Sequence, residues 1–206
     1  PYDGYDKIYK WLIENDKYYN FCISYKDYET YKRDGANIDK LLVCPNGAQH
    51  RDYHFTEKPL KPSWTLYLGR IEPRKRQYLY QDIYGVEFVG KYTDTTSFDR
   101  NRDCYLGQWE HEYKLQHVTD YGNMMLLSDG ENGTPLVIKE ALVAGLGVVV
   151  SKYAAHDLDT SLPFVTVIPD EKWEDIEYVQ EKLIENRKIS VTMRKEIRQY
   201  GVDNFS

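Results

Sequence analysis

Long apolar segments are missing from this 206-residue sequence. No run approaches the roughly 20 apolar residues that a membrane-spanning helix needs, and the stretch that starts at Pro1 lacks the apolar region of a secretory signal peptide. Cysteine is scarce as well: the three cysteines, at positions 22, 44 and 104, include no CxxC pair. Because this argues against both a disulfide framework and a thiolate metal site, we expect a cytoplasmic protein without a transmembrane segment.

An excess of positive charge is also lacking, since 27 Lys and Arg face 33 Asp and Glu and the net charge is −6. This balance argues against general nucleic-acid binding, which depends on a surplus of Lys and Arg. A small anion held by a few local cations remains compatible with it. Tyrosine, in contrast, is abundant: the 41% of hydrophobic residues includes 20 tyrosines, so the core must lean on aromatic side chains.

Short apolar runs alternate with helical patterns along the chain. Strands are expected at 21–24, 41–44, 64–68, 86–89, 124–127, 148–150 and 164–168, and helices near 25–33, 74–84, 110–121, 136–144, 171–186 and 190–200. Continuously apolar strands separated by helices imply a parallel sheet covered on both faces. We therefore expect an α/β fold with a doubly wound, Rossmann-like sheet, whose ligands bind beyond the carboxyl ends of the strands.

A basic turn follows the expected strand at 64–68. Gly69 lets a ligand approach the backbone, and Arg70 and Lys75 are among four cations within seven residues. Guanidinium and ammonium groups facing the crevice suit a diphosphate. A solvated charge run at the start of a helix is an equally compatible interpretation of this turn alone.

A second candidate site follows the strand at 124–127. The loop at 128–134 contains two glycines and enters a helix at Pro135, so free backbone N–H groups and the positive end of the helix dipole form an anion site. Glu140 lies about a turn and a half into this helix, where a carboxylate accepts hydrogen bonds from both hydroxyls of a ribose. An exposed helical glutamate would be the default interpretation without the loop before it.

Four segments together resemble the family 4 retaining glycosyltransferases. Residues 68–75 look like the family's phosphate-binding turn, and 132–140 with the small-residue helix that follows is similar to its signature of two glutamates with seven residues between them. Residues 43–47 are similar to the strand and turn that open the family's C-terminal domain, and Leu106-Gly107-Gln108 to its nucleotide-base loop. The resemblance covers roughly residues 38–200.

The resemblance implies a GT-B architecture, in which 37–206 would be the nucleotide-sugar domain and 1–36 the remnant of an acceptor domain or a linker. Arg70 and Lys75 would neutralise the diphosphate leaving group, and Glu140 would bind the ribose. Two cations and a helix N-terminus would replace a metal ion, so no metal or other cofactor is expected. The expected partners are a nucleotide sugar, an acceptor that is a glycan, a lipid or a protein, and a missing N-terminal domain. Without that domain, transfer of a hexosyl group in glycan synthesis would be weak or absent.

The sequence departs from the family's signature at its first glutamate. Asn132 stands eight residues before Glu140, and Glu131 precedes it, so either residue is a candidate for the catalytic position. Gly133 and Thr134 are the expected backbone donors to the donor sugar, because Pro135, which is also part of this loop, has no N–H. Two alternatives stay open: a sugar-nucleotide epimerase of the same architecture, and a non-catalytic module that binds a nucleotide sugar or a carbohydrate.

Overall fold

The computed structural model describes residues 5–93, 97–131 and 133–206. The chain forms two compact units, Pro1–Asn46 and Gly47–Ser206. The domain boundary predicted from the sequence lies between residues 36 and 37, and the boundary between the two units lies ten residues later. It lies later because the strand at 41–43 pairs with a strand of the smaller unit.

The smaller unit pairs two short parallel strands, β1 (Asn20–Cys22) and β2 (Leu41–Val43). Two helices, α1 (Tyr5–Glu14) and α2 (Tyr25–Arg33), complete it, and α1 was not expected from the sequence. Residues 43–47 were expected to include the strand and turn that open the C-terminal domain. In the structure, β2 pairs with β1 and contributes to the small core of this unit.

Five parallel strands form the sheet of the larger unit, in the order β4-β3-β5-β6-β7. They are β3 (Lys61–Leu68), β4 (Val86–Val89), β5 (Tyr121–Leu126), β6 (Gly147–Ser151) and β7 (Val165–Ile168). Every residue of β4, β5 and β6 is buried, which explains the continuously apolar runs. The expected α/β fold with a parallel sheet is confirmed.

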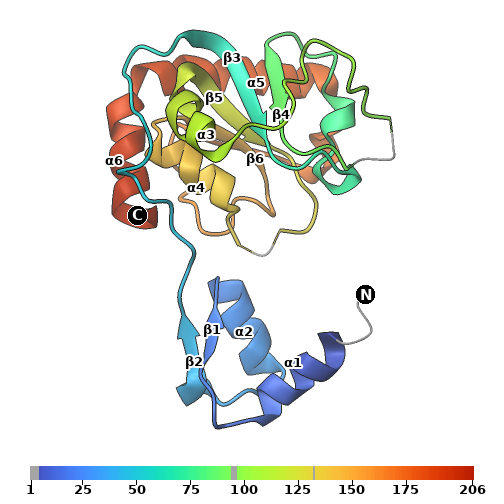
Figure 1. Cartoon of the computed structure of the whole chain (residues 1–206), viewed down its shortest axis with the longest axis vertical. Coiled ribbons are helices and arrows are strands. Elements are labelled where there is room, and N and C mark those ends of the chain that lie inside the picture. The colour runs from blue at the N-terminus through green and yellow to red at the C-terminus, as the bar shows by residue number, and fades with distance from the viewer. Residues whose placement is uncertain (1–4, 94–96, 132) are drawn as a thin grey trace. The chain divides into compact units, whose positions relative to one another are not determined.

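Helices cover both faces of this sheet (Figure 1). They are α3 (His111–His117), α4 (Leu136–Val143), α5 (Ile176–Thr192) and α6 (Arg194–Phe205). Figure 1 shows α3 and α4 on the near side of the sheet and α5 on the far side, so α4 and α5 cover opposite faces. In the described ranges, no helix has both the length and the apolar character that crossing a membrane requires.

Two expected helices differ in the structure. The segment at 74–84 forms two short 3-10 turns, Pro73–Lys75 and Gln77–Leu79, because Arg76 between them is left-handed, with φ +57°. The helix expected at 110–121 ends at His117, since Tyr121 already begins β5.

The strand order creates a crevice at one edge of the sheet. From β3 the chain continues to β4 on one side, and β5 then pairs with the other side of β3. The loops after Leu68 and Leu126 therefore leave the carboxyl ends of two neighbouring strands, β3 and β5, in opposite directions. Open α/β sheets bind ligands at such a point.

Candidate functional site

A buried tyrosine joins the two loops of the crevice. The hydroxyl of Tyr67, in β3, donates a hydrogen bond to the carbonyl of Lys75 and accepts one from the backbone N–H of Leu127 at 3.1 Å. Burial raises the pKa of this phenol well above its usual value, so the hydroxyl stays protonated. Tyr67 was not expected in the site, because in the sequence it is only a tyrosine, with one polar hydroxyl, within an apolar strand.

An ion cluster also links the loops. Glu131 Oε1 lies 3.0 Å from Arg74 Nη1 and 3.3 Å from Lys75 Nζ. The same Arg74 nitrogen donates to the carbonyls of Asp129 and Gly130, both at 3.3 Å. The structure thus brings Lys75 and Glu131, two residues named from the sequence, into direct contact. Arg74, whose part in the site was not foreseen, binds the same carboxylate.

This cluster fixes the charge of Glu131. Burial by itself would raise the pKa of the carboxyl, but Lys75 and Arg74 outweigh burial and hold the pKa below its usual value. The side chain of Lys75 is 12% exposed. The ionised carboxylate of Glu131 therefore covers the ammonium group of Lys75, which was expected to face a diphosphate. An incoming phosphate must either displace this carboxylate or share the ammonium group with it.

Arg70 and Gly69 lie at the mouth of the first loop. The side chain of Arg70 is 63% exposed, and its Nη1 lies 3.9 Å from Glu72 Oε2, so its guanidinium is open to a ligand. A Cβ on Gly69 would lie 3.4 Å from Lys75 Cδ, an ordinary van der Waals distance, so the lysine stem lies directly over this glycine. A Cβ on Gly90, after β4, would lie 2.0 Å from the carbonyl oxygen of Gly69, so these two turns are in close backbone contact.

The second loop is pinned by a reciprocal pair of hydrogen bonds. The backbone N–H of Thr134 donates to Asp157 Oδ2, and the N–H of Asp157 donates to Thr134 Oγ1, each at 3.0 Å. The Thr134 amide that was expected to face the sugar is therefore bound to Asp157 in this structure. Gly133 is buried and left-handed, with φ +82°, and Pro135 precedes the first residue of α4. Asn132 lies outside the described residues.

Glu140 is buried in α4 and carries one satisfied and one unsatisfied oxygen. Oε1 receives Lys114 Nζ at 2.6 Å, whereas Oε2 is buried without a hydrogen-bond partner. Tyr53 lies close by: burial first, and then the charge of Glu140 and a hydrogen bond to it, raise the pKa of its phenol. Lys114 thus takes one carboxylate oxygen and the other is buried, so Glu140 does not present the two open oxygens that the sequence suggested. Lys114 was missed because it lies 26 residues before its partner.

The expected base loop borders the same edge of the sheet. The carbonyl of Gly107 accepts a hydrogen bond from the N–H of Gly90 at 2.9 Å, and Gln108 is exposed. In the part of the chain that the structure describes, no group of three or more His, Cys, Asp or Glu side chains is placed to hold a metal ion.

Comparison with known proteins gives a consistent fold. No protein-family model matches the sequence, and no curated protein matches it significantly. Among solved structures, HepE of Anabaena in complex with UDP-glucose is 14% identical with a TM-score of 0.66, over 90% of this chain and 59% of that chain. The pneumococcal O-GlcNAc transferase GtfA, in complex with UDP and GlcNAc, is 13% identical with a TM-score of 0.73, over 98% of this chain and 45% of that chain.

A third similar structure is the sucrose-phosphate synthase of Thermosynechococcus elongatus, at 16% identity and a TM-score of 0.71, over 97% of this chain and 57% of that chain. The chain thus spans 45% to 59% of the lengths of these three structures. At such low identity the likeness speaks for the fold alone. The chain shares its fold with the GT-B glycosyltransferases.

Proposed function

We propose that this chain is the donor-binding part of a retaining glycosyltransferase of family 4, which transfers a hexosyl group from a nucleoside diphosphate sugar. The observation that carries the proposal is the meeting of the loops after β3 and β5, where Lys75, Arg74 and Glu131 form one cluster at the carboxyl ends of the strands. Two cations at a topological switch point suit a diphosphate. The UDP-glucose bound to HepE, a protein of the same fold, agrees with this ligand class.

Each residue has a separate task in the proposed complex. Arg70 and Lys75 bind the diphosphate, and Glu140 accepts a hydrogen bond from a ribose hydroxyl, which requires that its buried Oε2 be uncovered. During transfer, the bond between the anomeric carbon and the phosphate oxygen breaks, and its electron pair leaves with the nucleoside diphosphate. The acceptor oxygen forms the new bond to the anomeric carbon, and its proton passes to an oxygen of the departing diphosphate. Cations that stabilise the departing diphosphate lower the barrier of this step without a metal ion.

The sugar-facing role falls to Glu131 or Asn132. Transfer assays in the whole protein, with its acceptor domain, separate the two. If Glu131 serves the sugar, Glu131→Ala abolishes transfer and Asn132→Ala is nearly silent, and the reverse pattern assigns the role to Asn132. Transfer that survives both substitutions would remove this role from the loop.

The decisive experiment is calorimetry of this chain with UDP, GDP and ADP beside the matching monophosphates. We expect tighter binding of at least one diphosphate than of its monophosphate. A charge-assisted hydrogen bond contributes roughly 1.5–3 kcal/mol, so Arg70→Ala and Lys75→Ala should each weaken that diphosphate about ten-fold to a hundred-fold.

Lys188→Ala serves as the matched control. Lys188 is exposed in α5, in a hollow that the first residues of β3 also line, at the other end of the strand from Gly69. Its removal alters the net charge equally but should leave diphosphate affinity unchanged. Equal affinity for mono- and diphosphates, or an equal loss in the control, would overturn the proposal.

A further inference from the structure

Besides the hollow that contains Lys188, two more hollows lie at the amino ends of the strands, at the edge of the sheet opposite the candidate donor site. The larger, of about 680 Å³, is lined by Trp64, Tyr84 and the first residues of β4. The smaller, of about 270 Å³, is lined by Lys61, the first residue of β3, and Tyr121, the first residue of β5. Nothing in the proposed donor binding uses either of them.

One polar contact connects the two hollows. Lys61, in the wall of the smaller hollow, donates from Nζ to Glu87 Oε2 at 2.6 Å, and Glu87 lines the larger one. The hydroxyl of Tyr121 donates to the same carboxylate oxygen. Because the two hollows share this wall, we treat them as one feature, the amino-end groove.

Aromatic rings make up much of the groove. In the larger hollow, Trp64 and Tyr84 have ring centroids 5.7 Å apart. In the smaller, Trp109 lies 5.2 Å from Tyr113 and 6.2 Å from Tyr121. Tyr84 is 82% exposed and keeps open ring surface. Tyr113 also packs against the ring of His117, with centroids 4.0 Å apart, but remains 50% exposed. Exposed aromatic surface gathered at a concave site is typical of a binding site.

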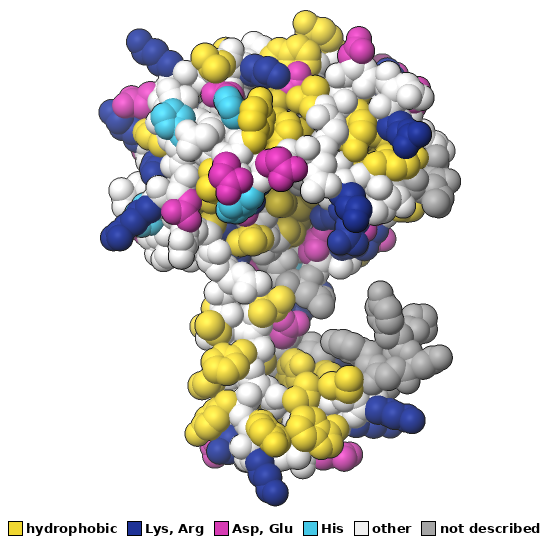
Figure 2. Space-filling model, in the orientation of Figure 1, with side chains coloured by type: hydrophobic (Ala, Val, Ile, Leu, Met, Phe, Trp, Pro, Cys, Tyr) yellow, Lys and Arg dark blue, Asp and Glu magenta, His cyan; other side chains and the backbone are white. Residues whose placement is uncertain are grey.

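The cations of the groove are already neutralised. Lys61 is paired with Glu87, and Arg102 Nη2 lies 2.7 Å from Asp82 Oδ1. Figure 2 agrees, because hydrophobic, acidic and histidine side chains mix on the face over α3, while Lys and Arg lie mainly around it. Among the described residues that line the two hollows, no Lys or Arg is left for an anion. The groove therefore favours an uncharged ligand.

We propose that the amino-end groove binds a neutral oligosaccharide. Sugar rings combine apolar C–H faces, which pack on aromatic rings, with hydroxyl edges that need donors and acceptors. The rim supplies these through Asn101 and Asp103 in the larger hollow and His117 in the smaller, where His117 Nδ1 is hydrogen-bonded to Asp120 at 2.7 Å. Two adjacent hollows of about 680 and 270 Å³ have room for more than one sugar ring.

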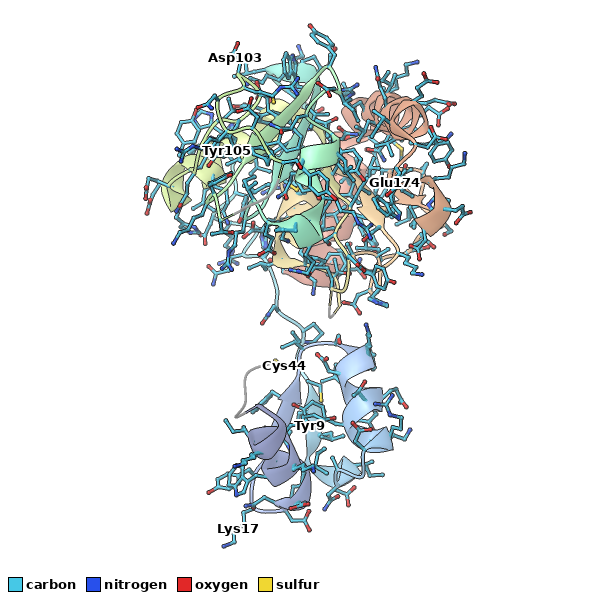
Figure 3. The ribbon with its side chains drawn as sticks, turned by 90° about the vertical axis from the view of Figure 1, so that its right-hand side faces the viewer. Tyr9, Lys17, Cys44, Asp103, Tyr105 and Glu174 are labelled. Carbon is cyan, nitrogen blue, oxygen red and sulfur yellow. The ribbon has the colours of Figure 1, made fainter. Side chains whose placement is uncertain are left out.

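The groove and the donor site are far enough apart to be occupied together. Trp64, in the wall of the larger hollow, lies five residues before Gly69, which is about 16 Å of extended chain. Figure 3 shows Asp103 at the upper edge of the larger unit and Tyr105 below it, and the hydroxyl of Tyr105 already contacts the carbonyl of Gly90 beyond the carboxyl end of β4. The saccharide is thus a second ligand, independent of the nucleotide.

The test begins with the whole chain on a printed array of neutral and acidic oligosaccharides, followed by calorimetry with the neutral glycan that gives the strongest signal. We expect binding to a neutral glycan that saturating UDP does not displace. Tyr84→Ala and Tyr113→Ala should each weaken it about ten-fold, since each removes an aromatic face. Tyr25→Ala, at a tyrosine that is 70% exposed in α2, is the matched control and should have no effect.

Several outcomes would overturn the proposal. The first is that no neutral glycan on the array binds, including the case in which only acidic glycans bind. The second is that UDP displaces the bound glycan. The third is that Tyr25→Ala loses as much glycan affinity as Tyr84→Ala. Only the displacement outcome involves a nucleotide. The array and the comparison of the tyrosine variants need none, so these measurements and the test of the proposed function fail separately.

Discussion

Lys114 Nζ lies 2.6 Å from Glu140 Oε1 and ties α3 to α4. The two partners are buried unequally, because the lysine side chain is 18% exposed and the glutamate side chain 6%. Removing the lysine therefore leaves the more deeply buried charge, that of Glu140, without a partner. Removing the glutamate leaves an ammonium group that can reach water. The cost of breaking this pair should depend on which partner is lost.

We predict that Lys114→Met lowers the free energy of unfolding by about 3 kcal/mol, the lower end of the range for a buried charge left unpaired. Glu140→Leu should cost less, and the double variant should cost less than the sum of the two, since it leaves no buried charge. Urea unfolding of all four proteins gives the coupling free energy. Additive losses would mean that the pair is not formed in solution.

A second prediction concerns the carboxylate that covers Lys75. Glu131→Gln removes a competitor for the ammonium group, so a nucleoside diphosphate should bind several-fold more tightly, by roughly 1 kcal/mol. Calorimetry with UDP checks this. Asp129→Asn is the control: Asp129 is paired with Arg76 at 3.6 Å in the same loop, and its loss leaves Lys75 covered. Weaker binding after Glu131→Gln would show that the acid orients the lysine for the ligand.

The same glutamate should make stability depend on pH. Because the cations hold the folded-state pKa of Glu131 below its ordinary value of 4.5, its contribution is present above that pH and is lost as the pH falls through the lower folded value. The free energy of unfolding should therefore differ between the native protein and Glu131→Gln near neutral pH, and the two should converge on acidification from about pH 4.5 downward. A difference that is constant down to pH 3 would exclude this ion cluster as the cause.

A fourth prediction concerns the contact between α4 and α6. A Cβ on Gly201 would lie 2.6 Å from the backbone carbon of Leu142 and from the nitrogen of Val143. Alanine is better than glycine in a helix by about 1 kcal/mol, yet the clash is with backbone that cannot move aside, so Gly201→Ala should destabilise the protein by about 1–3 kcal/mol. Gln199→Ala, on the exposed face of α6, should stay within about 0.5 kcal/mol. Urea unfolding of both variants decides the sign, and a stabilised Gly201→Ala would contradict the contact.

Local pattern was sufficient for much of the fold. The apolar run at 148–150 is a buried strand, as expected for a sheet covered on both faces. The strand at 86–89 is buried as well, although it contains Glu87, which is paired with Lys61. The helix at 25–33 begins where Ser24 accepts a hydrogen bond from the N–H of Asp27, a capping preference that is visible in the sequence. The positions of the two loops at the carboxyl ends of β3 and β5 follow from the same pattern.

Contacts across the fold decided the rest. The pattern at 74–84 is helical, but Arg76 is left-handed and lies 4.0 Å from the ring centre of Trp173 and 3.6 Å from Asp129, two partners that are distant in sequence. The strand at 41–43 has the same composition whichever strand it pairs with, and β1 turned out to be its partner.

The sequence by itself determined the fold class and which loops meet at the crevice, because the periods of strands and helices are local properties of the chain. Only the tertiary structure decided the electrostatic state of the candidate site: Glu131 lies on Lys75, Asp157 takes the amide of Thr134, and Lys114 holds one oxygen of Glu140. The physical reason is that an ion pair or hydrogen bond depends on a few ångströms between groups that are tens of residues apart, and the packing of helices on the sheet sets those distances.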